Sequence, residues 1–386
     1  MTEITPTRAE TLPNFFTLHA QPRRNGFFGL SQLESFINQN VEPYLRAPSK
    51  PTLIFDFSTV TVWDIAALLW LTPALHHYKR NLGLSYLLRL PSPSPSIPEE
   101  QRAALERSAD YLRRWRFDRA LRTIDADVPN LLVPDQQDYF SPPEPRRFYL
   151  PKRQADESGL LSSLISRRLA EIRELSDPAF TGSAPISPDR ISQCVRQFQA
   201  ERIGDILTSQ CGIETRKADL FSDHLLTEAL LNVKEHPNAT IGMVAISLMG
   251  ATRELILTVV DNGESIPATI FERYATDARQ STSGAPQPTS TPYETLTLRQ
   301  RADVAHHATK PGVTRKTGLD AATAGMGLTY IRDDCVGTFR GNLTIVTDSI
   351  KLTYQKNAQD DPAFSEWRHS WQGNLLRIAI PLTHAE

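Results

Sequence analysis

The segment Glu228-Ala-Leu-Leu-Asn232-Val-Lys-Glu-His236 decides the fold of the second half of the chain. Its polar residues Glu228, Asn232 and His236, together with His224, recur every four residues and therefore share one face of a helix. A solvated polar stripe is the simplest interpretation, but Asn is unfavourable inside a helix and usually has a specific role there. The opposite face is apolar and can pack on a sheet through Leu225, Leu226, Ala229, Leu230 and Val233.

Two shorter motifs follow further along the chain. The apolar run Glu254–Asp261 ends in Asp261-Asn-Gly263, a tight-turn sequence that is compatible with a simple hairpin. A carboxylate buried at a strand end can also accept a hydrogen bond from an exocyclic amine, and so select adenine over guanine. Gly325-Met-Gly327-Leu328 precedes a helical run, where glycine lets the backbone approach a phosphate, although a helix-capping turn would explain it too. In this order the three motifs predict a nucleotide pocket.

Together the three motifs resemble those of the GHKL ATPase superfamily, which includes gyrase, histidine kinases and anti-sigma-factor serine kinases. The resemblance covers about residues 219–381. Glu228-Ala-Leu-x-Asn232-x-x-x-His236 looks like the N-box of anti-sigma kinases and of one histidine-kinase class. Asp261-x-Gly263 looks like the G1 box, and Gly325-x-Gly327-Leu328 looks like the G2 box. The resemblance implies ATP and Mg²⁺ as cofactors.

The resemblance also implies a role for each motif residue. Asn232 would coordinate Mg²⁺, which takes most of its other ligands from phosphate and water. Glu228 would be the general base that orients a water or a hydroxyl for attack on the γ-phosphate. Asp261 would hold the adenine amine, and Gly263 would leave room for the base. The residues implied near the phosphates are His236, Lys234, Gly325, Gly327, Leu328 and, as a lid cation, Lys316.

Two departures from the family pattern weaken the expectation of turnover more than that of binding. The G1 pattern usually ends in a second glycine, but Ser265 stands at that position and would narrow the floor of the site. The span from Asp261 to Gly325 is long for a lid, and residues 281–292 within it have a low-complexity composition that predicts mobility. Such a lid would close only when nucleotide or a partner orders it.

The first half of the chain predicts a small α/β domain. Strand-like, apolar segments at 52–60 and 84–90 alternate with helix-like segments at 63–80 and 99–121. Over about residues 15–125 this pattern resembles the STAS fold, in which a strand leads into a helix with serines near its start. Ile65 and Ala66 occupy those serine positions, so the resemblance implies a docking module without a phosphorylatable serine. Any strand followed by a helix would give a similar pattern.

The predicted fold class is therefore α/β, with a STAS-like domain at 1–128, a Pro-rich linker and connecting helix at 129–187, and a GHKL-like ATP-binding domain at 188–386. The last domain is expected to be an α+β sandwich with a mixed sheet packed on helices. Its predicted elements are helices at 188–208, 219–236 and 326–335, and strands at 240–249, 254–260, 342–347 and 374–381, with a long irregular stretch before the second glycine motif. A further helix is expected at 157–175.

The composition limits the classes of partner. The 386 residues carry a formal net charge of −2, so nucleic acid and anionic membrane are poor partners. Three cysteines without close pairing fit a reducing compartment, and the longest apolar stretch, Ile65–Leu75, is too short to span a bilayer. We therefore expect a cytoplasmic, ATP-binding regulatory protein that acts on a protein partner.

Three alternatives for that activity stay open. The protein could be a kinase of a separate protein, because no phosphoacceptor histidine is evident in the chain. It could equally be an ATPase or a nucleotide sensor that changes shape without phosphorylating protein. A non-enzymatic scaffold with a degenerate pocket is the third alternative, motivated by Ser265 and the unusual lid. The oligomeric state does not follow from the sequence.

Overall fold

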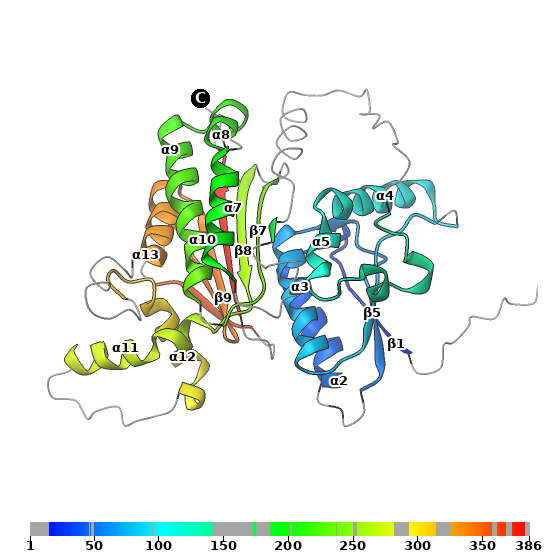
Figure 1. The fold of residues 1–386 in the computed structure, drawn as a ribbon, viewed down its shortest axis with the longest axis horizontal. Coiled ribbons are helices and arrows are strands. Elements are labelled where there is room, and N and C mark those ends of the chain that lie inside the picture. The colour runs from blue at the N-terminus through cyan, green and yellow to red at the C-terminus, as the bar shows by residue number, and fades with distance from the viewer. Residues whose placement is uncertain are drawn as a thin grey trace, which may run out of the picture.

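The computed structural model describes residues 15–45, 47, 50–94, 96–141, 173–174, 186–200, 203–236, 238–249, 253–281, 293–313, 326–356, 361–367 and 373–382. Helices and sheets occur in both halves of the chain, in agreement with the α/β class. Each half is built around its own sheet, and the two sheets lie on opposite sides of one helix, α3 (Ile65–Arg80) (Figure 1).

The N-terminal half contains a parallel sheet of three strands. Strand β3 (Thr52–Asp56) lies between β1 (Phe15–His19) and β5 (Tyr86–Arg89). A second parallel pair joins β2 (Phe27–Phe28) to β4 (Val62–Trp63). The remaining helices are α1 (Leu30–Phe36), which continues through a π-helical turn at Ile37–Val41 into α2 (Glu42–Leu45), and α4 (Glu99–Arg114) and α5 (Phe117–Arg122).

The predicted strand–helix–strand–helix order of this half is confirmed, but the last helix is interrupted. Arg116 adopts a left-handed backbone conformation, with φ at 54°, and separates α4 from α5. Apolar periodicity continues across the break, because Leu112, Phe117 and Leu121 are all buried in the same core. For this reason the sequence pattern predicts one helix, although the backbone changes direction at Arg116.

The beginning of the segment predicted as a linker packs on the N-terminal half. Two short 3₁₀ helices, Val128–Leu131 and Pro134–Gln136, follow α5. The Gln136 side chain accepts a hydrogen bond from Leu90 N at 2.7 Å and donates one to Leu90 O at 2.8 Å. The Tyr139 hydroxyl donates to Pro91 O at 2.8 Å. The prolines of this segment prevent longer helices and strands, but the segment still packs on the N-terminal half. Of the helix predicted at 157–175, the structure describes only Arg173–Glu174, and these two residues form a strand that pairs with Met243 and Val244, so the prediction is wrong for them. The rest of the predicted helix lies outside the described residues.

The C-terminal half contains a seven-stranded sheet whose order is β11-β10-β9-β12-β8-β7-β6. Its strands are β6 (Arg173–Glu174), β7 (Gly242–Met249), β8 (Glu254–Asp261), β9 (Asn342–Thr347), β10 (Ile350–Tyr354), β11 (Ala363–Glu366) and β12 (Asn374–Pro381). All of the recorded pairings are antiparallel. The predicted mixed sheet is therefore wrong for the described strands. Only four residues separate β7 from β8 and two separate β9 from β10, and such short connections join antiparallel neighbours.

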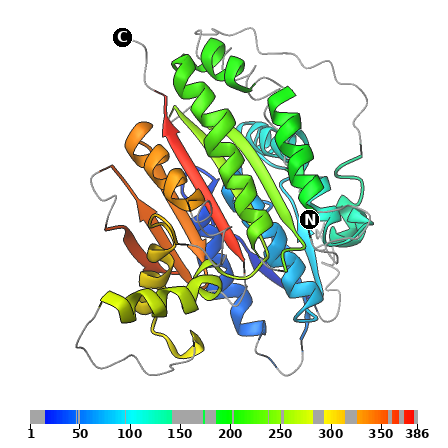
Figure 2. The same ribbon diagram turned by 60° about the vertical axis from the view of Figure 1, so that its left-hand side comes forward.

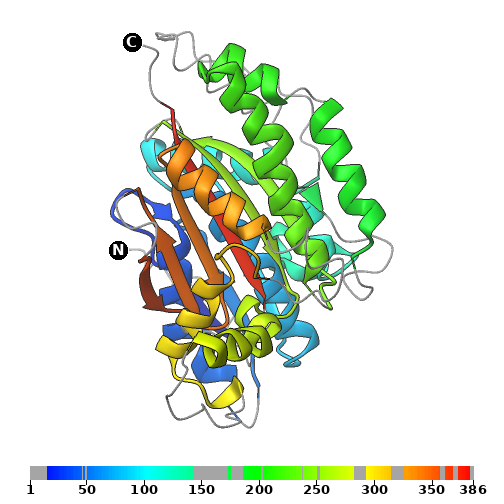
Figure 3. The same cartoon turned by 90° about the vertical axis from the view of Figure 1, so that its left-hand side faces the viewer.

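Helices cover one face of this sheet (Figures 2 and 3). They are α7 (Pro188–Ala200), α8 (Ile203–Cys211), α9 (Thr215–Asp219) joined through a π-helical turn to α10 (Leu226–Glu235), and α13 (Gly327–Arg332). The predicted apolar face of α10 is confirmed, because its five residues are buried in the core on the sheet: Leu225, Leu226, Ala229, Leu230 and Val233.

The stretch predicted as irregular contains two helices, α11 (Ile266–Ser281) and α12 (Leu298–His307). Helix α12 begins with a capping box, in which the Thr297 hydroxyl accepts a hydrogen bond from Gln300 N and the Gln300 side chain accepts one from Thr297 N. These helices were not predicted, because the low-complexity composition between them made the whole stretch look irregular. Residues 282–292, which were predicted to be mobile, lie outside the described residues.

The other face of the C-terminal sheet is buried by α3. This helix contacts β7 and β8, and its Trp70 ring meets the Trp367 ring edge to face with centroids 5.7 Å apart. The sheet residues that share the core of the N-terminal half are Ile241, Met243, Ala245, Ile256, Val260, Val346, Leu375 and Ala379. Because α3 is apolar on nearly all sides, it forms a common layer between the two sheets.

We expect Trp70→Ala to lower the free energy of unfolding by about 3–5 kcal/mol, because Trp70 fills the space between the two sheets. Urea unfolding followed by far-UV circular dichroism measures this loss. Hydrogen exchange should accelerate in β8 as well as in α3. Phe16→Ala is the control, since the Phe16 side chain is about half exposed. Destabilisation confined to the N-terminal half would contradict the shared layer.

Stability should also depend on the protonation of His76 within α3. Burial, with smaller contributions from Arg80 and His77, lowers the pKa of His76 from 6.5 to about 4. In the unfolded chain His76 binds a proton near pH 6.5, whereas in the folded chain it binds one only near pH 4. The free energy of unfolding therefore falls as the pH drops from 6.5 to about 4. The slope is at most about 1.4 kcal/mol per pH unit for one group.

His76→Gln should flatten this pH dependence between pH 6.5 and about 4, as measured by urea midpoints at several pH values. Burial also lowers the pKa of His77, so part of the slope should remain in the variant. Phe16→Ala again serves as the control, because the Phe16 side chain is about half exposed and does not titrate. An unchanged slope in His76→Gln would show that the imidazole accepts a proton readily in the folded protein.

Candidate functional site

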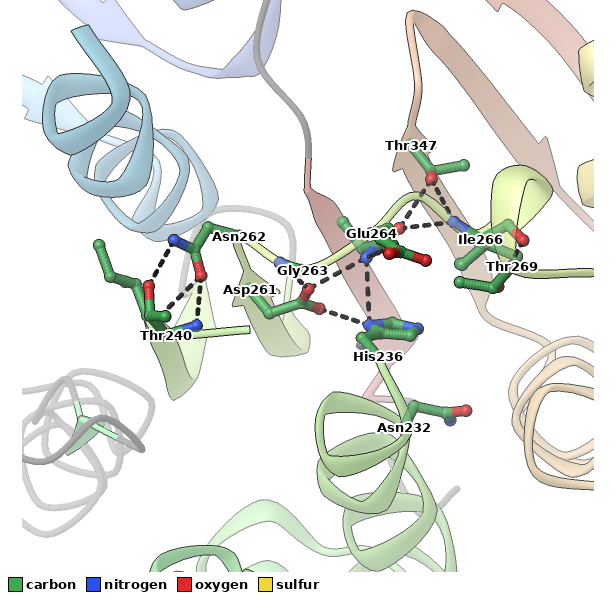
Figure 4. Close-up of polar contacts among 12 residues, drawn as sticks. Asn232, His236, Thr240, Asp261, Asn262, Gly263, Glu264, Ile266, Thr269 and Thr347 are labelled. Carbon is green, nitrogen blue, oxygen red and sulfur yellow. Dashed lines mark hydrogen bonds and ion pairs between the residues drawn. The ribbon is translucent and has the colours of Figure 1, made fainter. Parts of the chain in front are cut away.

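The polar stripe of α10 does not face open solvent. His224, Glu228, Asn232 and His236 are all half-buried. Figure 4 shows Asn232 and His236 at the end of α10 that lies next to the loop after β8. At one end His224 Nδ1 lies 2.8 Å from Asp334 Oδ2, and its ring packs against Tyr330. The interpretation as a solvated stripe is therefore wrong, and the four-residue spacing reflects a packed polar face.

Gly327 approaches this stripe closely from the start of α13. A Cβ atom placed on Gly327 would lie 2.9 Å from Glu228 Oε2 and 3.6 Å from each terminal atom of the Asn232 amide. A contact of 2.9 Å is shorter than van der Waals distance, so any side chain here would displace the Glu228 carboxylate. The absence of a side chain thus brings the backbone of α13 against Glu228 and Asn232.

The Asn232 amide has a fixed orientation. Its Nδ2 donates a hydrogen bond to the backbone oxygen of Glu228 at 2.9 Å. A carbonyl can only accept, so the nitrogen must face the helix and Oδ1 must face away from it. An amide oxygen is a hard ligand of the kind that Mg²⁺ prefers. No group of three or more His, Cys, Asp or Glu in the described residues could hold a metal ion, so a Mg²⁺ here would depend on phosphate oxygens for its other ligands.

Asp261 ends β8 and is 2% exposed. Its Oδ1 accepts hydrogen bonds from Gly263 N at 2.9 Å and from Asn374 Nδ2 at 3.0 Å. Its Oδ2 accepts one from His236 Nδ1 at 2.8 Å. The predicted turn chemistry of Asp261-Asn-Gly263 is present, but the turn leads into α11 and not into a paired strand. The hairpin alternative is therefore wrong, and three donors converge on a buried carboxylate.

His236 is placed at the Asp261 side of the site. It follows the last turn of α10, and its side chain is 11% exposed. The family resemblance implied a position near the phosphates, whereas the imidazole turns towards the carboxylate expected to hold the purine. The side chain of His236 thus contacts Asp261, while its backbone N–H donates a hydrogen bond to the backbone oxygen of Asn232, one helical turn earlier, at 3.2 Å (Figure 4).

Sequence reasoning missed Asn374, the first residue of β12. Asn374 pairs in register with Asp261 on one side and with Thr347 on the other. Its Oδ1 accepts hydrogen bonds from Ile266 N at 3.1 Å and from the Thr347 hydroxyl at 2.7 Å, while its Nδ2 also donates to Glu264 O at 2.9 Å. Asn is uncommon in strands, so its position at the head of an apolar strand was a usable signal. The hydrogen-bond partners of Asn374, by contrast, depend on strand register, which the sequence pattern does not give.

Ser265, the departure from the glycine pattern, is buried and hydrogen-bonds Tyr293. The Tyr293 hydroxyl also donates to Asp348, and Arg301 Nη1 lies 3.1 Å from Asp348 Oδ2. Burial and the Asp348 carboxylate raise the pKa of Tyr293, which therefore stays a donor. These contacts tie the segment that precedes α12 to the turn after Thr347.

The remaining predicted residues have less defined positions. Leu328 is half-buried and packs against the core on the helical face of the sheet. Lys234 belongs to α10, but its side chain is not among those that the structure describes. Gly325 and Lys316 lie outside the described residues, so their predicted contacts with phosphate stay predictions.

No protein-family model matches the chain, and no match was found among curated proteins or among solved structures. The resemblance to GHKL ATPases therefore depends on the motif residues and on the contacts described above. Within the described residues, none of the helices combines the length and the apolar character that crossing a bilayer requires.

We expect Asn374→Ala to lower the free energy of unfolding by about 2–4 kcal/mol, since Ile266 N and Asp261 would each lose a buried partner. Urea unfolding measures this loss. Asn342→Ala is a matched control: Asn342 begins the neighbouring strand β9, is half-buried, and makes no side-chain hydrogen bond with another described residue. Equal losses in the two variants would contradict a special role for the Asn374 network.

Proposed function

We propose that the chain is an ATP-binding regulatory protein whose C-terminal half binds Mg-ATP and whose nucleotide state is communicated to a protein partner. The observation that carries this proposal is the approach of Gly327 to Glu228 and Asn232, with 2.9 Å between its hypothetical Cβ and Glu228 Oε2. Two motifs almost one hundred residues apart in sequence meet there as the family resemblance requires. The proposal places the protein in the GHKL superfamily and in the cytoplasm.

At the phosphate end, this chain supplies an oxygen ligand and a carboxylate. Asn232 Oδ1 would complete the coordination of a Mg²⁺ bound mainly by the β- and γ-phosphates. The Glu228 carboxylate, next to Gly327, would accept the proton of an attacking water or hydroxyl. Because Gly327 has no side chain, the backbone of α13 can approach the phosphates as closely as it approaches Glu228.

At the purine end, Asp261 would select adenine. An ionised carboxylate only accepts hydrogen bonds, so it attracts the amine of adenine and repels the carbonyl oxygen at the equivalent position of guanine. Asn374 and Gly263 hold the carboxylate in place through Oδ1. Selectivity for ATP over GTP is therefore part of the proposal.

The alternative is a non-hydrolysing nucleotide sensor or a scaffold with a degenerate pocket. Two observations favour it: Asp261 is 2% exposed with three protein donors around it, and the buried Ser265 occupies the position of a glycine. In either case the STAS-like N-terminal half would contact the partner. Since α3 is enclosed between the two sheets, the partner would bind other surfaces of that half.

Asn232→Ala should weaken Mg-ATP binding about tenfold or more, because one metal ligand is lost while the amide contributes only a local bond to its own helix. Isothermal titration calorimetry with ATP and GTP, with and without Mg²⁺, measures the effect. Asn342→Ala is the control and should bind as the wild type does. Equal Mg-ATP affinity in Asn232→Ala, or equal affinity of the wild type for ATP and GTP, would contradict the assigned roles.

The same preparations distinguish an enzyme from a sensor. Release of phosphate, or transfer of the γ-phosphate to a partner protein, should fall by about 10²–10⁴-fold in Glu228→Gln if Glu228 is the general base. Labelled partner identifies a kinase, and free phosphate without labelled protein identifies an ATPase. Intact ATP recovered from a binding-competent protein would identify the sensor.

A further inference from the structure

The carboxylate of Asp261 has little acceptor capacity left in this structure. Each carboxylate oxygen can accept about two hydrogen bonds. Oδ1 already receives two, from Gly263 N and Asn374 Nδ2, while Oδ2 receives one from His236. The side chain of Asp261 is 3% exposed, so an external donor must displace or pass a protein group to reach the carboxylate.

The proton on His236 is defined by its neighbours. Asn374 Nδ2 also lies 3.1 Å from His236 Nδ1, but its two hydrogens are directed to Asp261 Oδ1 and Glu264 O. That approach is therefore a close contact between two nitrogens. His236 Nδ1 must carry the hydrogen that Asp261 Oδ2 accepts. The other ring nitrogen, Nε2, lies on the side away from Asp261 (Figure 4).

The two partners of this pair differ in freedom to move. Asp261 is fixed through Oδ1, because Gly263 N is backbone and Asn374 is itself held by Thr347 and Ile266. His236 stands just outside α10 with φ at −78° and ψ at 116°, in an extended conformation. A rotation of its side chain breaks the bond to Asp261 without disturbing the helix. His236 is therefore the movable member.

We propose that His236 is a specificity-determining residue that competes with the purine amine for Oδ2 of Asp261. In the closed state the imidazole N–H occupies the position that the amine of adenine requires. In the open state the imidazole turns away and Asp261 accepts from the ligand. This proposal rests on the proposed function, because it concerns the same carboxylate and the same ligand.

The closed state should lower the apparent affinity for adenine nucleotides. When the competent state is a fraction of the population, the apparent Kd rises by the inverse of that fraction, so a pair closed nine-tenths of the time weakens binding about tenfold. Guanine presents an oxygen to Asp261 and gains nothing from the open carboxylate. Removal of the competing N–H should therefore strengthen ATP binding selectively.

The chain contains a matched control for this effect. His224 lies on the same helical face and its Nδ1 is also 2.8 Å from a carboxylate, that of Asp334. It stands at the other end of the stripe, three helical turns from His236. His224→Ala removes an equivalent histidine–aspartate pair without exposing Asp261.

Calorimetric titration of wild type, His236→Ala and His224→Ala with Mg-ATP and Mg-GTP tests the proposal. His236→Ala should bind ATP about fivefold or more tightly than the wild type, with GTP affinity unchanged and His224→Ala within about twofold of the wild type. If His236→Ala does not fold, His236→Phe keeps a ring without a donor and should show the same gain. Nitrogen chemical shifts of the imidazole should also show the Nδ1–H tautomer in the nucleotide-free protein and its loss with Mg-ATP.

The outcomes separate the two proposals. Unchanged or weaker ATP binding in the folded His236 variants, with a wild type that binds ATP, overturns the competition and leaves the proposed function intact. An Nε2–H tautomer in the nucleotide-free protein overturns it as well. Absence of nucleotide binding in all of the proteins overturns the proposed function and the competition with it.

Discussion

The register of three neighbouring strands is the constraint on which the site depends. Asp261, Asn374 and Thr347 lie side by side because β12 pairs with β8 and β9 in one fixed alignment. A slip of one residue would turn Leu375 and Leu376 to the wrong faces, and these two residues belong to different cores. Burial of both faces of β12 therefore fixes the register, and the register in turn assembles the polar network around Asp261.

The second constraint is that the two halves share α3. Its residues bury the face of the C-terminal sheet that the other helices leave uncovered, and Asp64, which caps α3, lies 4.0 Å from Arg377 of β12. Burial raises the pKa of the Asp64 carboxyl, and the nearby Arg377 partly offsets this effect. The sheet that carries Asp261 therefore packs directly against a helix of the N-terminal half. Communication with a partner, as proposed, would use this contact.

The features that depend on residues close together in the sequence could be predicted from its local patterns. The helical face of α10 and the strand that ends at Asp261 follow from spacing and residue type, whereas a meeting of the Gly327 motif with α10 was implied by the family resemblance. The partners of Asn374 and the contact of His236 with Asp261 could not be predicted, because they depend on which strands pair and in what register. The antiparallel sheet and α11 were missed for related reasons: pairing is a long-range property, and low-complexity neighbours concealed the helical pattern.

Helix α10 gives the site one rigid end and one movable end. Glu228 and Asn232 lie inside the helix, and the backbone of α13 at Gly327 limits their movement from outside. His236 lies beyond the last helical turn, where rotation of the side chain leaves the backbone hydrogen bonds of the helix in place. In the proposed function, the movable residue therefore lies at the end of the site assigned to the purine, and the fixed residues lie at the end assigned to the phosphates. Because His236 directly follows the helix that carries Glu228 and Asn232, displacement of His236, as proposed, would leave the two side chains assigned to the phosphates held by α10 and Gly327.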